Sequence, residues 1–138
     1  MSTSRLHFRV VTPQRILVDF DNVNVVTVPG AHGQISILPY HTPLLTKLEP
    51  GLVTYRTEHE ERILGVSQAF MEVSDNRVNI LADYALLPEE ADERRAQEAR
   101  ERAQKEMERR LEGTDFQQVE AELRKALLEL KLVEHTRK

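Results

Sequence analysis

The sequence predicts an α+β protein, with an N-terminal antiparallel β-sandwich in residues 1–87 and a C-terminal antiparallel two-helix hairpin in residues 88–138. The first observation is charge, since 16 of the first 87 residues are charged but 26 of the last 51 are. The second is that all six prolines lie at or before Pro88, and four of the five glycines precede it. The third is the spacing of apolar residues, which changes there from every second residue to every third or fourth. We therefore place a domain boundary near residue 88.

The first part reads as a series of short strands, because apolar and polar residues alternate in runs rich in Val, Ile and Leu. Proline, glycine, asparagine or aspartate separates most of these runs. Their spacing of roughly 8–12 residues is typical of an antiparallel sandwich or barrel. No intervening segment is long enough for the crossover helix of a parallel βαβ unit. The predicted strands are 6–12, 16–20, 23–28, 34–38, 52–56, 62–66, 69–73 and 78–82.

The first helix is predicted to begin at Pro88, because proline is well tolerated in the first helical turn. The acidic residues that follow, Glu89, Glu90 and Asp92, suit the positive end of the helix dipole. A stripe of mostly small apolar residues then leads to a stop at Gly113. The stripe consists of Ala96, Ala99, Ala103, Met107 and Leu111.

The second helix carries a stripe of larger residues, which we expect to pack over the alanines of the first helix. An alanine stripe buries little apolar surface at roughly 25 cal/mol per Å², so the hairpin is expected to be marginally stable and releasable. Acid-to-base pairs four residues apart, among them Glu98–Arg102 and Glu120–Arg124, each contribute about 0.2–0.5 kcal/mol to a solvated helix. The predicted second stripe is Phe116, Val119, Leu123, Leu127, Leu130 and Val133.

Composition and motifs exclude several classes of function. The net charge of -4 argues against a protein that binds nucleic acid through phosphates. Without cysteine the chain can form no disulfide, thiolate centre or Cys-based metal site. The five histidines lack metal-ligand spacing, and no P-loop, dinucleotide or Gly-x-Ser-x-Gly motif occurs. We find no signal peptide or membrane-spanning run, and we predict no catalytic residues and no metal site.

The run from Pro29 to Gly51 resembles a signature of the epsilon subunit of the bacterial F-type ATP synthase. The resemblance extends over the whole chain, in the expected order. The segments 10–13 and 78–82 are similar to the family's first and last strands, and 92–96 and 121–132 fall in its two C-terminal helices.

The resemblance implies a non-catalytic central-stalk subunit on the cytoplasmic face of the cell membrane. The sandwich would bind the gamma subunit and the c-ring, coupling ion flow to ATP synthesis. The loop 31–41 would face the c-ring, with Gln34 and His41 as candidate contacts. The helices, when extended, would inhibit ATP hydrolysis, and Arg124, Lys125 and Lys131 would meet the alpha and beta subunits.

The resemblance also implies a possible regulatory ATP site on the folded hairpin, although no cofactor is required. Asp92, Arg95 and Ala96 match the family motif, Ala91 replaces a larger aliphatic residue, and Arg102 matches a basic position. Lys125 stands where an arginine is used, and Glu129 where a second arginine is expected. Arginines can hold a triphosphate, whereas a glutamate would repel it.

Two other classes of function stay open from the residues alone. One is a scaffold β-domain with a helical arm, which would bind no gamma subunit. The other is a stand-alone ATP-sensing module, which would need an output that the sequence does not reveal.

Overall fold

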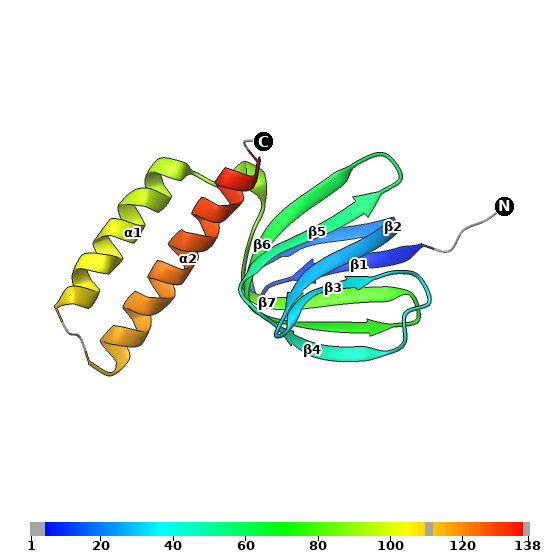
Figure 1. Ribbon diagram of the computed structural model, residues 1–138, viewed down its shortest axis with the longest axis horizontal. Helices are drawn as coiled ribbons and strands as arrows, with labels where there is room; N and C mark the ends of the chain where they lie inside the picture. The colour runs from blue at the N-terminus through cyan, green and yellow to red at the C-terminus, as the bar shows by residue number, and fades with distance from the viewer. Residues whose placement is uncertain (1–4, 110–111, 137–138) are drawn as a thin grey trace. The chain divides into compact units, whose positions relative to one another are not determined.

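The computed structural model describes residues 5–109 and 112–136. The chain divides into two compact units, Met1–Leu87 and Pro88–Lys138. The first is a β-sandwich and the second a pair of helices (Figure 1), which confirms the predicted α+β fold class.

Seven strands form the sandwich. They pair in the order β1-β7-β6-β5-β2-β3, β1 also pairs with β2, and β4 pairs with β6. The strands are β1 (Leu6–Val11), β2 (Ile16–Gly30), β3 (Gly33–Ile37), β4 (Leu44–Leu48), β5 (Gly51–Thr57), β6 (Glu61–Ser74) and β7 (Arg77–Leu86).

One pairing departs from the predicted antiparallel arrangement, because β1 and β7 run parallel. The strands β1, β7, β6, β5 and β2 form a closed ring. All neighbouring pairs in this ring except β1–β7 are antiparallel. Directions cannot alternate around a ring with an odd number of strands, so one pair has to be parallel. The sheet is therefore mixed, and closure of the ring explains the exception.

Two strands are longer than predicted. β2 unites the predicted strands 16–20 and 23–28, and β6 unites 62–66 and 69–73. Asn22 and Gln68, which lie at the predicted breaks, have positive φ angles of 65° and 53°. At Asn22 an extra residue bulges out of the β1–β2 register, and β2 then passes from β1 to β5. At Gln68 β6 passes from β5 to β4. A local left-handed residue thus bends each strand without ending it.

No strand was expected in the segment that forms β4. Leu44–Leu48 pairs with β6 from Val73 to Ala69. The strand lies between Pro43 and Pro50, so neither proline interrupts its hydrogen bonds.

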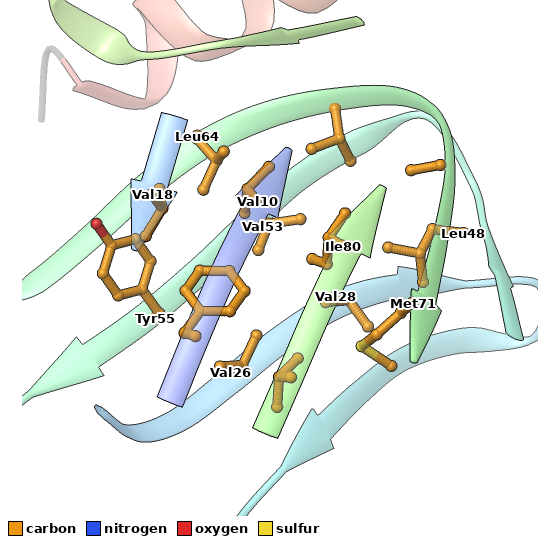
Figure 2. Packing of buried hydrophobic residues seen from close by; sticks show 14 of the residues in the cluster. Val10, Val18, Val26, Val28, Leu48, Val53, Tyr55, Leu64, Met71 and Ile80 are labelled. Carbon is orange, nitrogen blue, oxygen red and sulfur yellow. The ribbon is translucent and has the colours of Figure 1, made fainter. Parts of the chain in front are cut away.

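Alternate residues of the strands fill the core of the sandwich. Val10, Val53 and Ile80 are fully buried and lie in one cluster of side chains from three strands (Figure 2). The rings of Phe8 and Tyr55 meet with centroids 4.9 Å apart at an interplanar angle of 52°. Such tilted aromatic pairs add to the stabilisation from burial.

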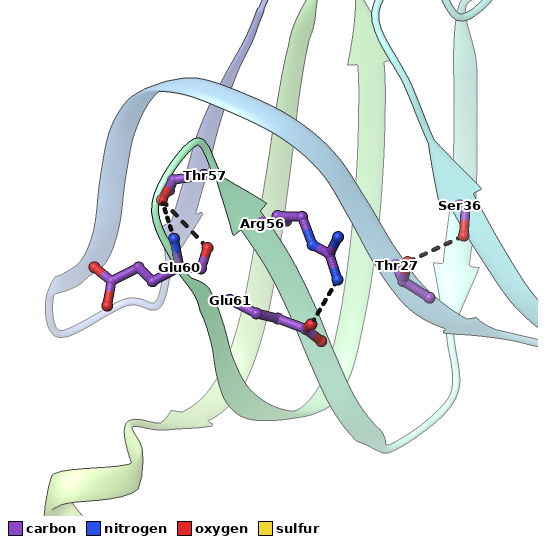
Figure 3. A network of polar contacts seen from close by, with 6 residues as sticks. All are labelled: Thr27, Ser36, Arg56, Thr57, Glu60 and Glu61. Atoms are coloured by element: carbon purple, nitrogen blue, oxygen red, sulfur yellow. Dashed lines mark hydrogen bonds and ion pairs between the residues drawn. The ribbon is translucent and has the colours of Figure 1, made fainter.

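Polar contacts stabilise the β5–β6 turn and join neighbouring strands of the sandwich (Figure 3). At the tip between β5 and β6, the backbone N–H of Glu60 donates to Thr57 Oγ1 at 3.2 Å, and Arg56 pairs with Glu61 at 3.1 Å. Thr27 and Ser36 join their hydroxyl groups at 3.0 Å between β2 and β3.

The second unit contains a short 3₁₀ helix, η1 (Pro88–Glu90), followed by α1 (Glu93–Glu108) and α2 (Thr114–Thr136). The first α-helix therefore begins five residues later than predicted. Gly113 precedes α2 with a φ angle of 65°, a left-handed conformation that glycine adopts without strain. Ala96 and Ala103 of α1 are buried as predicted, whereas Leu111 lies outside the described residues.

The buried side of α2 differs from the predicted stripe. Leu127 is 47% exposed, whereas Ala126 is buried. Val119 and Ala126 are seven residues apart and so return to nearly the same side of the helix, and Leu127 lies about 100° further round. The buried residues of α2 are Val119, Ala126, Leu128, Glu129 and Leu132.

Candidate functional site

The N-terminus of α1 is built around Asp92, which caps the helix in an extended conformation. Its Oδ1 atom accepts a hydrogen bond from the Arg95 backbone N–H at 3.1 Å. Its carbonyl oxygen accepts the first helical hydrogen bond, from the N–H of Ala96, at 3.0 Å. The Asp92 carboxylate is therefore engaged in capping the helix.

A carboxylate from the other helix completes this end of the hairpin. Glu129 Oε2 accepts from the Asp92 backbone N–H at 2.7 Å and from Arg95 Nη2 at 2.6 Å. The Glu129 side chain is 8% exposed and that of Arg95 is 61% exposed. Arg95 also donates to the Glu90 carbonyl oxygen at 3.2 Å. We call Asp92, Arg95 and Glu129 the Glu129 cluster.

The structure brings together only part of the predicted ATP-binding set. Asp92 and Arg95 are close, but Glu129 lies against both, and Ala96 is buried beside them. Arg102 is two helical turns further along α1, about 10 Å away. There it lines a groove of about 450 Å³. Lys125 is exposed one turn before Glu129. Because these residues do not all converge on one place, the ATP site stays a prediction.

The predicted partner contacts lie on separate elements. The resemblance implied a loop over 31–41, but Gly33–Ile37 within it forms β3, paired with β2, close to the predicted strand 34–38. Gln34 is exposed near the start of β3, and His41 follows its end, where its Nδ1 contacts the Thr42 carbonyl oxygen at 2.7 Å.

All three predicted basic contacts, Arg124, Lys125 and Lys131, lie on α2. Arg124 is paired with Glu120 at 2.8 Å, as predicted, and Lys131 is exposed. On α1, Glu98 pairs with Arg94 at 3.3 Å, whereas the prediction paired it with Arg102.

An apolar outer face on the sandwich was missed by the sequence analysis. Lys47, Phe70, Leu81 and Val11 are successive cross-strand neighbours on β4, β6, β7 and β1, so they share one face. Phe70 and Leu81 are 52% and 57% exposed and line a groove of about 530 Å³. The available signal was apolar residues out of phase with the core, since Ala69, Met71, Ile80 and Ala82 point inward. We call Lys47, Phe70 and Leu81 the outer face.

A second charged cluster joins β1 to β2. His7 Nε2 lies 2.6 Å from Asp19 and His7 Nδ1 lies 2.5 Å from Asp21. Only an imidazolium can donate from both nitrogens. The hydrogen bond to Asp21, joined by that to Asp19, raises the pKa of His7 above 6.5 despite partial burial.

Among residues 5–109 and 112–136, no three histidine, aspartate or glutamate side chains are grouped to hold a metal ion. Within the same described ranges, no helix is long and apolar enough to cross a membrane.

A β-sandwich with an apolar outer face, followed by a helical hairpin with a buried carboxylate, defines a two-unit protein with a distinctive order of elements. The family model described as "ATP synthase, Delta/Epsilon chain, beta-sandwich domain" matches residues 5–88, more than half of the chain. The chain belongs to this family.

Relatives extend the similarity over both units. The ATP synthase epsilon chain of Moorella thermoacetica is 39% identical over 127 residues, covering 91% of this chain and 94% of the relative. That of Alkalilimnicola ehrlichii is 38% identical over 136 residues, covering 98% and 96%. A chain in the Euglena gracilis mitochondrial ATP synthase structure (OSCP/F1/c-ring) shares the fold, with a TM-score of 0.69 and 19% identity. That match covers 99% of this chain and 83% of the other.

Proposed function

We propose that this chain is the non-catalytic epsilon subunit of an F-type ATP synthase, part of the rotor that couples ion flow to ATP synthesis. The observation that carries the proposal is the identity of 38–39% to ATP synthase epsilon chains across more than nine-tenths of the chain. The proposal places the protein peripherally at the cytoplasmic face of a bacterial membrane.

In this proposal the sandwich docks on the gamma subunit and the c-ring. The outer face supports a docking role, because Phe70 and Leu81 expose apolar surface beside the Lys47 ammonium group. We assign the outer face to the gamma subunit, and Gln34 and His41 to contacts with the c-ring.

The proposal gives the hairpin a regulatory role, in which it inhibits ATP hydrolysis by extending toward the alpha and beta subunits. Two features support a movable arm. The hairpin is a compact unit of its own, and its α1 side is lined by the small buried residues Ala96 and Ala103. Arg124, Lys125 and Lys131 are the proposed contacts with the catalytic subunits.

Truncation tests the regulatory role. A chain ending at Pro88 keeps the whole sandwich and lacks both α-helices. In a reconstituted ATP synthase we expect it to co-purify with the gamma subunit and to raise ATP hydrolysis above that of the complex with the full chain. Co-purification with unchanged hydrolysis would rule out inhibition by the hairpin, and failure to co-purify would argue against docking by the sandwich.

A second proposed function is binding of regulatory ATP by Asp92, Arg95, Ala96, Arg102 and Lys125. It is supported by the chemistry of the α1 N-terminus, where the Asp92 N–H and the Arg95 guanidinium bind the Glu129 carboxylate; a phosphate would have to displace that carboxylate. Calorimetric titration of the full chain with ATP tests it, with Arg95→Ala as the weakened variant. Absence of heat at millimolar ATP would end this proposal.

A further inference from the structure

The Glu129 cluster lies at the open end of the hairpin. The helices are joined at one end by the turn before α2, where Gly113 adopts its left-handed conformation. At the other end, the first residues of α1 meet Glu129 in the last third of α2. The contact is therefore placed where separation of the two helices would be largest.

The chemistry of the cluster suits a specific tie between helices. The carboxylate receives a guanidinium N–H and a backbone N–H, and it lies at the positive end of the α1 dipole. Because the Glu129 side chain is 8% exposed, opening the hairpin would expose the carboxylate and leave the Asp92 N–H without this acceptor.

Two further kinds of described contact in the hairpin are apolar packing and ion pairs within a single helix. The buried apolar side chains pack without a directional preference; they are Ala96, Ala103, Val119, Ala126, Leu128 and Leu132. The ion pairs Arg94–Glu98 and Arg124–Glu120 each lie within one helix, so they stabilise helices without joining them.

We infer that Glu129 is a latch: its contacts with Asp92 and Arg95 hold the hairpin closed, and breaking them lets the helices separate about the Gly113 turn. The latch deepens the proposed regulatory role and rests on it for its consequence in the ATP synthase. Its strength would set the fraction of chains whose arm is open.

A distance measurement on the full chain tests the latch. The chain has no cysteine, so Arg94→Cys and Lys131→Cys introduce a pair of spin labels at exposed positions on the two helices. In this background Glu129→Ala is expected to raise the open, long-distance population about tenfold, since hydrogen bonds to charged groups are the strong ones. Glu129→Gln keeps the shape and an acceptor oxygen and should give a smaller increase.

A matched control and a double-mutant cycle separate the latch from a general effect. Glu134→Ala removes an exposed glutamate from the same helix and should leave the distances unchanged. Arg95→Ala combined with Glu129→Ala should open the hairpin little further than Glu129→Ala alone. Circular dichroism verifies that the helices persist. Unchanged distances in Glu129→Gln and Glu129→Ala, or fully additive effects of Arg95→Ala and Glu129→Ala, would overturn the latch.

Glu129→Ala without the two cysteine substitutions, placed in the reconstituted ATP synthase, then tests the function. If Glu129→Ala opens the hairpin in the isolated chain and also lowers ATP hydrolysis in the complex, both proposals are supported. If the hairpin opens but hydrolysis stays unchanged, the latch holds and the proposed inhibition fails.

Discussion

Different interactions stabilise the inside of the sandwich and the inside of the hairpin. The sandwich closes a ring of strands around large side chains, among them Phe8, Leu64 and Met71, which are fully buried. The hairpin buries fewer and mostly smaller apolar side chains, three alanines with Val119, Leu128 and Leu132, together with one carboxylate, Glu129. Apolar area gives a strong attachment without direction, whereas an ion-paired cluster is directional and sensitive to the loss of a single partner. The contrast favours a sandwich that stays folded as a unit and a hairpin that can open reversibly; these are called the body and the arm below.

The largest expected effect tests the strength of the body. Phe8→Ala should lower the free energy of unfolding by about 3–5 kcal/mol, because it leaves a cavity against Tyr55. Phe70→Ala, at a side chain that is 52% exposed, is the matched control and should cost much less. Urea denaturation followed by tyrosine fluorescence measures both. Equal losses would contradict the assignment of Phe8 to the core and Phe70 to the surface.

A smaller effect is expected on docking of the body. Phe70→Asp with Leu81→Asp should weaken binding to the gamma subunit by about 2 kcal/mol or more, because charges replace the centre of the outer face. The fold should persist, since both residues point away from the core. Pull-down with the gamma subunit measures binding. Ile16→Asp, at another exposed apolar residue, is the control, and an equal loss there would remove the outer face as the docking site.

A larger side chain in the closely packed part of the hairpin should lower the stability of the hairpin. Ala103→Leu inserts a larger side chain at a fully buried position and should destabilise the hairpin by about 1–3 kcal/mol. Gln104→Leu adds a similar side chain at an exposed position and should be nearly neutral. Helix-specific circular dichroism during thermal melting compares them. A neutral Ala103→Leu would mean that α1 and α2 do not pack closely at this position.

The smallest effect is the pH dependence of the His7 contacts. Because the folded-state pKa of His7 is raised above 6.5, the contribution is fully present below 6.5 and is lost as pH rises through the folded pKa. Both partners are more than half exposed, so we expect less than about 1 kcal/mol.

Thermal midpoints of the wild type and His7→Gln at several pH values from 5.5 to 9 measure this contribution. The two should converge as pH rises. His59→Gln, at the exposed tip between β5 and β6, should follow the wild type throughout. A constant gap between wild type and His7→Gln would exclude a protonation effect.

Sequence patterns predicted the features that are set by residues close together in the chain. The alternation along β1 and β7 located their buried faces, and the change in period located the start of the helical unit. The sequence predicts strand ends at Asn22 and Gln68, because a polar residue in a strand pattern looks the same whether the strand ends there or bends. β4 was missed because its stability comes from pairing with β6.

The candidate site was harder to predict than the fold. Asp92 and Arg95 are close in sequence, so a helix start indicated that they would be neighbours. Glu129 entered only as an unfavourable residue for phosphate, because its contact with Arg95 depends on how the two helices face each other. The outer face was missed for the same reason, since Lys47, Phe70 and Leu81 become neighbours only through strand pairing.

The parallel pairing of β1 with β7 has a consequence for the order of folding. The first strand of the sandwich cannot complete its hydrogen bonds until the last strand has been made, some 70 residues later in the chain. During synthesis, the edge of β1 that pairs with β7 should therefore stay without its hydrogen bonds until β7 has been made. The hairpin, whose partners are at most about 40 residues apart, should form as soon as α2 is available.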